Sequence, residues 1–107
     1  MEAIVVLCTC PTDESATRIA DTLVEEKLAA CVNALPGVRS TYRWEGEVQH
    51  DDEMLLVIKT VRARFEELRA RILSLHPYEL PEVIAVEVSA GHAPYLDWIA
   101  SSTKSGA

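Results

Sequence analysis

Near the N-terminus, the spacing of hydrophobic residues changes from a continuous run to a helical repeat. Ile4 to Cys8 is apolar and rich in β-branched residues, which is typical of a strand buried on both faces, and Pro11 lies beyond its end. Thr12 or Asp13 can cap a following helix, because apolar residues then recur every three or four positions as far as Leu28. The pattern therefore predicts a strand and then a helix from about Asp13 to Leu28.

Two strand-like segments follow, and they predict one unusually long hairpin. Ala29 to Leu35 and Val38 to Trp44 are separated by Pro36-Gly37, a pair that breaks or bulges a strand. Glu45-Gly46 has the composition of a hairpin turn. After a polar stretch, Glu53 to Thr60 is apolar enough for a central strand.

The second half of the chain predicts a helix, a strand and a short final helix. Val61 to Leu75 has the clearest helical spacing, and the prolines of segment 76–82 make that connection extended. Val83 to Val88 reads as the last strand, and a third helix is expected from Pro94 to about Ser102. Thr103 to Ala107 is expected to be a frayed tail.

The order of elements predicts the fold class. A β-α-β-β-α-β-α order in 107 residues is that of a single α+β domain, residues 1–107, with a ferredoxin-like sandwich and an added C-terminal helix. A two-stranded ribbon that extends past its own core has little to bury against, so we expect another copy of the chain to cover it. Tyr42 and Trp44 lie near the tip of this hairpin, and we expect them, with Trp98, in such an interface.

Composition narrows the partners and the compartment. Ten basic and seventeen acidic residues give a net charge of −7, which repels phosphate backbones and anionic bilayers, so neither nucleic acid nor a membrane is an expected partner. The N-terminus lacks the basic start of a signal peptide, and we expect a cytoplasmic protein. Three cysteines, an odd number, then indicate reduced thiols and no disulfide framework.

The pattern of cysteines allows two interpretations, packing in the core or metal binding. Cys8 and Cys10 are two positions apart on one strand, so their side chains leave the same face. They are either two small buried hydrophobic side chains or ligands for a soft metal such as copper(I) or zinc. Cys31 follows two alanines and is expected to be packing.

Of the three histidines, His76 has the most informative position, at the end of a helix and directly before Pro77. It is either a capping residue at a helix C-terminus or a metal ligand. His50 is expected to be solvated, and His92 to cap the third helix. No spacing typical of a closed zinc site occurs, so any metal site must combine distant segments.

Signatures of enzymes are missing from the sequence. There is no phosphate-binding glycine loop and no G-x-S-x-G elbow, and a Cys8 nucleophile with His76 as its base would lack an oxyanion donor. We therefore expect a binding protein and no enzyme.

Several segments together resemble the CutA family of divalent-cation tolerance proteins. They are Val5-Val6-Leu7-Cys8-Thr9, Leu28-Ala29-Ala30-Cys31-Val32-Asn33, Ser40 to Gly46, Ile58-Lys59-Thr60, His76 to Glu82 and Tyr95-Leu96-Asp97-Trp98. The resemblance implies a compact homotrimer in which long hairpins pair between subunits and the third helix helps to seal the edge. It also implies binding of copper or a similar divalent metal such as zinc, with Cys8 and His76 as the ligands. Some relatives have a second histidine before the one that matches His76, where this chain has Leu75.

Two other functions fit the same architecture. The fold resembles that of PII signalling proteins, which suggests a sensor that binds a small metabolite in clefts between subunits. Four residues near the ends of elements favour this alternative: Lys59, Arg62, Arg64 and Tyr78. A purely structural trimer would need no ligand.

Overall fold

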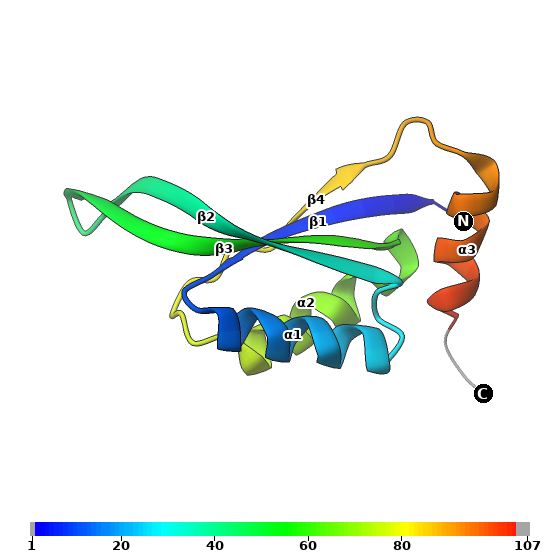
Figure 1. Cartoon of the computed structure of the whole chain (residues 1–107), viewed down its shortest axis with the longest axis horizontal. Coiled ribbons are helices and arrows are strands. Elements are labelled where there is room, and N and C mark those ends of the chain that lie inside the picture. Colours follow the sequence, from blue (N-terminus) through cyan, green and yellow to red (C-terminus); the bar gives the residue numbers. More distant parts are fainter. Residues whose placement is uncertain (1, 105–107) are drawn as a thin grey trace.

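The computed structural model describes residues 2–104, and it confirms the α+β ferredoxin-like class (Figure 1). Four strands form one antiparallel sheet in the order β2-β3-β1-β4, and α1 and α2 lie side by side on one of its faces. The strands are β1 (Ala3–Cys10), β2 (Cys31–Trp44), β3 (Glu47–Val61) and β4 (Ile84–Glu87). The helices are α1 (Asp13–Glu25), α2 (Phe65–Leu75) and α3 (Ala93–Ser102), and a short 3-10 turn, η1 (Arg62–Arg64), precedes α2.

The core lies between the sheet and the two helices. Strand β1 is central, with β3 on one side and β4 on the other, and its alternate residues Val6, Cys8 and Cys10 are fully buried. Strand β3 contributes Leu56 and Ile58 to the same face. The helices complete this core with Ala16, Ile19, Leu23, Leu68 and Ile72.

Helix α1 begins as expected but ends earlier than the sequence predicts. Thr12 is the N-cap, and its hydroxyl accepts from the Ser15 amide at 3.1 Å. The predicted end at Leu28 is wrong, because Lys27 has a left-handed φ of 61° and the amides of Lys27 and Leu28 donate to the carbonyls of Val24 and Leu23. This is a Schellman C-cap, whose hydrophobic contact explains why Leu28 is buried without being helical.

The β2–β3 hairpin extends past the helices (Figure 1). Its turn has Glu45 at φ 50° and Gly46 at φ 83°, the positive values that a tight hairpin turn of the primed type requires. The register shifts between Leu35 and Val38, so Pro36-Gly37 forms the bulge that the sequence predicts.

Two further boundaries differ from the predictions. Val61 pairs with Ala3 as the last residue of β3, so the predicted helical start at Val61 is wrong and α2 begins only at Phe65, after η1. The expected frayed tail is wrong for Thr103, which is fully buried and whose hydroxyl donates to the Ile99 carbonyl at 2.8 Å. Residues 105–107 of that predicted tail lie outside the described residues.

The second face of the sheet is not covered by α1 or α2 (Figure 1). It carries Leu7 on β1, opposite Val57 on β3 and Ile84 on β4. Ile84 and Val86 on the edge strand β4 are each 53% exposed. This second face, called the open face below, therefore presents apolar side chains to its surroundings.

Candidate metal centre

Three potential metal ligands meet at one end of the core. The sulfurs of Cys8 and Cys10 and a ring nitrogen of His76 all lie within 4.8 Å of one another. Both cysteines are fully buried and His76 nearly so, and no disulfide joins the cysteines. The structure thus combines the two residues expected as ligands, Cys8 and His76, with a third that the sequence left open between packing and ligation.

The fold explains how residues so distant along the chain come together. Alternation along β1 turns Cys8 and Cys10 toward the helices, where Val6 also points. Helix α2 runs back under the sheet and ends at Leu75, and the extended C-cap conformation of His76 carries the chain to the end of β1. Its Nε2 lies 2.7 Å from the carbonyl oxygen of Thr9, the residue between the two cysteines.

Both ring nitrogens of His76 already have partners. The Tyr78 amide donates to Nδ1 at 3.1 Å, so Nδ1 carries a lone pair and the proton lies on Nε2, which donates to Thr9. His76 is therefore held as one neutral tautomer. A metal ion can bind this imidazole only by replacing one of the two hydrogen bonds, and at Cys8 it would replace the weak bond from the thiol to the Thr9 carbonyl, 3.8 Å away.

The thiols influence each other's ionisation. Contact with the Cys10 sulfur and then burial raise the pKa of Cys8 well above its ordinary value, and the carboxylates of Glu82 and Glu53 add to this. The pKa of Cys10 is lowered by its side-chain contact with Cys8, although burial and Glu53 act in the opposite direction. A cation bound to both sulfurs would therefore have to displace the proton of Cys8, whose pKa is raised.

An acidic cavity of about 440 Å³ adjoins the centre. None of the three ligands lines this cavity, but Thr9 and Tyr78, which hydrogen-bond to His76, do. The buried carboxylate of Glu53 accepts a hydrogen bond from the Tyr78 hydroxyl at 2.6 Å. Glu79 and Glu82 also line the cavity, so its potential favours cations. Sequence patterns do not predict this arrangement, because Glu53 and Tyr78 belong to separate segments and the fold alone brings them together.

The other expected functional residues lie outside the three-ligand cluster, although Tyr42 and Trp44 line the acidic cavity. Tyr42, Trp44 and Trp98 are 41%, 38% and 44% exposed in the single chain, so they are available for an interface. Cys31 is half-buried on the open face opposite Lys59 and lies outside the three-ligand cluster. His50 is exposed, as expected, and His92 is at the N-cap of α3 without a side-chain capping bond.

The four residues that favour a metabolite sensor do not converge within one chain. Lys59 bonds Asn33, and Arg62 pairs with Glu2 and Glu87, each at 2.8 Å. Arg64 and Tyr78 line two different cavities.

Comparison with known proteins decides the family. A family model described as CutA1 divalent ion tolerance protein matches residues 4–102. The chain belongs to this family. The divalent-cation tolerance protein CutA of Thermus thermophilus is 50% identical over 99 residues, which cover 92% of this chain and 96% of that protein. A chloroplastic CutA protein of Arabidopsis thaliana is 46% identical over 95% of this chain, which spans 56% of the plant protein.

Solved CutA1 structures share the whole fold. The T. thermophilus structure has a TM-score of 0.94 at 49% identity and covers 95% of this chain and 99% of its own. CutA1 from Oryza sativa has a TM-score of 0.95 at 43% identity over 99% of this chain and 97% of its own. Among residues 2–104, no helix is long and apolar enough to cross a membrane.

Proposed function

We propose that this CutA1 chain binds a soft metal ion, copper(I) before zinc, through Cys8, Cys10 and His76, and that it carries out no catalysis. The observation that supports this is the buried cluster of two sulfurs and one imidazole within 4.8 Å. Thiolates select copper(I) and zinc over hard cations. Two sulfurs bound to one zinc ion at about 2.3 Å each can be at most about 4.6 Å apart, so the cluster needs little closure.

The surroundings of the cluster favour cation uptake over chemistry. The acidic cavity lined by Thr9 and Tyr78, the two hydrogen-bond partners of His76, raises the local concentration of cations near the centre. His76 is fixed by two hydrogen bonds, and the pKa of Cys8 is raised, so this pair does not form an activated nucleophile with a free base.

The second part of the proposal concerns assembly and compartment. We propose a homotrimer, in which the apolar open face and the hairpin are covered by neighbouring chains. Exposed Ile84 and Val86 on that face, and exposed Tyr42, Trp44 and Trp98, supply apolar area of the kind that interfaces bury. A cytoplasmic location would keep Cys8 and Cys10 as thiols, the form in which they can bind metal.

An anaerobic titration with copper(I) against a competing chelator tests the metal site. Cys8→Ser and Cys10→Ser should each weaken binding at least tenfold, about 1.4 kcal/mol, because each removes one thiolate. Cys31→Ser is the matched control, since Cys31 lies outside the cluster, and it should bind like the parent chain. Equal affinity in all four proteins would exclude this site.

His76 is tested separately, because its imidazole must first give up a hydrogen bond. We expect His76→Ala to weaken copper(I) binding less than either serine variant does. A larger loss than in Cys8→Ser would mean that the imidazole, and not the thiol pair, is the principal ligand. Zinc titrations of the same proteins then give the order of the two metals.

A further inference from the structure

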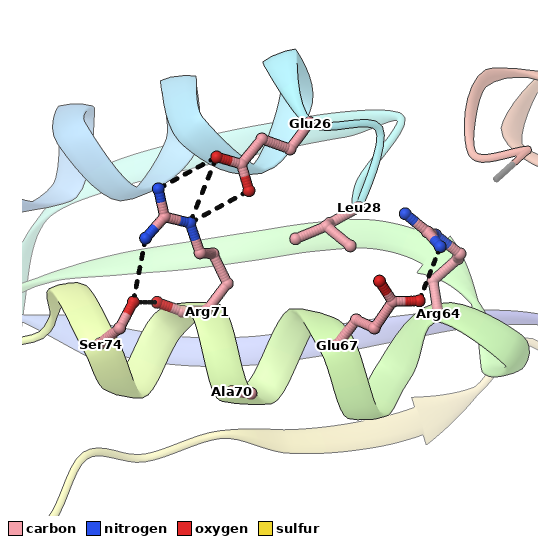
Figure 2. A pocket seen from close by; sticks show the side chains of 7 residues that line it. All are labelled: Glu26, Leu28, Arg64, Glu67, Ala70, Arg71 and Ser74. Carbon is pink, nitrogen blue, oxygen red and sulfur yellow. Dashed lines mark hydrogen bonds and ion pairs between the residues drawn. The ribbon is translucent and has the colours of Figure 1, made fainter. Parts of the chain in front are cut away.

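A second cavity, of about 430 Å³, lies where the end of α1 meets α2 (Figure 2). Its α2 side consists of residues spaced to share one face of the helix, and its other side consists of Glu26 and Leu28, which follow α1. That side is lined by Arg64, the last residue of η1, and by four residues of α2, which are Glu67, Ala70, Arg71 and Ser74. It shares no lining residue with the acidic cavity beside the candidate metal centre.

The arginine at one end of this cavity is fully engaged. Arg71 donates from Nε to both carboxylate oxygens of Glu26, at 3.0 and 3.3 Å, and from Nη2 to Oε2 at 3.0 Å. Its Nη1 donates to the Ser74 hydroxyl at 3.2 Å, so each of its three nitrogens has an acceptor (Figure 2). This pair joins α1 to α2 and leaves Arg71 little capacity for a ligand.

The arginine at the other end is different. Arg64 donates from Nη1 to a single oxygen of Glu67 at 2.8 Å, and its buried Nε has no acceptor among the atoms of residues 2–104. A guanidinium offers five N–H donors in a planar fork that fits a carboxylate bidentately, and a buried unpaired donor is unfavourable. The Arg64 side chain is 10% exposed, whereas that of Glu67 is 66% exposed and can move into solvent.

We propose that this cavity binds a small organic carboxylate at Arg64. The ligand's two oxygens accept from Nε and Nη2 of Arg64, beside the Glu67 oxygen that accepts from Nη1, and its short hydrocarbon part lies over Leu28 and Ala70 between the two arginines. A volume of about 430 Å³ is within the size range of small-molecule sites. Since Glu26 is held by Arg71, Glu67 is the one carboxylate in the cavity lining that competes for Arg64.

The direct test follows the arginine Nε–H signals by ¹⁵N NMR while sodium acetate or sodium butyrate is added at constant ionic strength, with sodium chloride as reference. The Arg64 signal should shift and saturate with both carboxylates but not with chloride, and it should shift more than that of Arg71. Butyrate should bind about tenfold more tightly than acetate, because two further methylenes leave water. A shift that is shared by all arginines and does not saturate would overturn the proposal.

Two substitutions with opposite expected signs make the test specific. Arg64→Gln should abolish the smaller saturable shift of the Arg71 signal, whereas Glu67→Gln should strengthen butyrate binding several-fold because it removes the competing carboxylate. Glu66→Gln and Arg69→Gln are matched controls, since that pair lies on α2 outside the cavity lining and makes the same kind of contact, at 3.2 Å. Neither control should change the affinity.

If Arg64→Gln does not fold, the Arg64 signal can still be followed in the two glutamate variants. In that case the comparison of Glu67→Gln with Glu66→Gln decides, because both remove one negative charge from the same turn of α2. Equal butyrate affinity in these two variants would overturn the proposal.

Discussion

The two faces of the central sheet are completed in different ways. On the face covered by α1 and α2, Val6, Cys8 and Cys10 of β1 are fully buried. On the open face, their neighbours Leu7 and Thr9 on the same strand remain half-buried. The side chains on one face of β1 are therefore fully buried by the chain itself. Those on the other face become buried only if another molecule covers them.

This difference separates what one chain can do alone from what it needs a partner for. The candidate metal centre lies on the covered face, where the helices exclude water and fix the donors. The open face carries apolar side chains and no such cluster among residues 2–104. On the proposed function, metal binding is then a property of the protomer, and the open face serves assembly.

The largest expected effect is loss of assembly by a charge on the open face. In Val57→Lys the ammonium would be buried unpaired in every interface of the proposed trimer, so we expect monomers, because burying an unpaired charge costs several kcal/mol. Size-exclusion chromatography with light scattering measures the mass. Val24→Lys, on exposed α1, is the control and should keep the parent mass. A trimeric Val57→Lys would remove the open face from the assembly.

Next in size is a cavity on the covered face. Ile58 is fully buried, so Ile58→Ala should lower the free energy of unfolding by about 3 kcal/mol, through lost burial and the cavity left behind. Denaturant unfolding at one fixed protein concentration checks this value. The neighbouring change Val57→Ala should cost less in the monomer, and a larger loss than for Ile58→Ala would reverse the ranking of the two faces.

The pH dependence of metal binding gives a third, smaller effect. Because the pKa of Cys8 is raised, its thiol is protonated at neutral pH and binding must release that proton. Apparent copper(I) affinity should therefore rise with pH, by about tenfold per unit for each proton released, or about 1.4 kcal/mol. Titrations from pH 6 to pH 8 measure the slope, and Cys31→Ser should leave it unchanged. A flat profile would contradict binding at Cys8.

The smallest effect concerns the contact between Glu53 and Tyr78. Tyr78→Phe leaves the buried Glu53 carboxylate without this donor, which should cost about 1 kcal/mol of stability at neutral pH. The pKa of Tyr78 is raised, first by burial and then by Glu53, so this contribution is present below the ordinary tyrosine pKa and is lost as the pH rises above it. Parent and variant unfolding curves should accordingly converge in strong alkali.

Most of the fold could be predicted from local sequence patterns, and the errors in the predicted boundaries also have local causes. The order of elements, the Glu45-Gly46 turn and the Pro36-Gly37 bulge were predictable from spacing and turn chemistry. The end of α1 was not, because Leu28 continues the hydrophobic repeat although it is the buried contact of a C-cap. Hydrophobic spacing indicates which residues are buried, and here the buried positions continue to Leu28, beyond the end of α1 at Glu25.

The candidate site was predictable only in part. Alternation places Cys8 and Cys10 on one face, and this signal could have identified Cys10 as a ligand. The approach of His76 was implied by resemblance and not by spacing, because 67 residues separate it from Thr9 and only the sheet order and α2 bring them together. The hydrogen bonds that occupy both its nitrogens depend on side-chain geometry that no sequence pattern records.

Because both ring nitrogens of His76 are hydrogen-bonded, metal binding at this residue and attachment of the following segment oppose each other. A metal ion that takes a ring nitrogen must release either the Thr9 carbonyl or the Tyr78 amide, and so loosens one attachment of the segment that leads into β4. By thermodynamic linkage, a partner that binds only the attached segment lowers the affinity for the metal ion, and the metal ion lowers the affinity for that partner by the same factor. On the proposed metal binding, occupancy at His76 is therefore coupled to the attachment of segment 76–82, which leads into β4 at the edge of the open face.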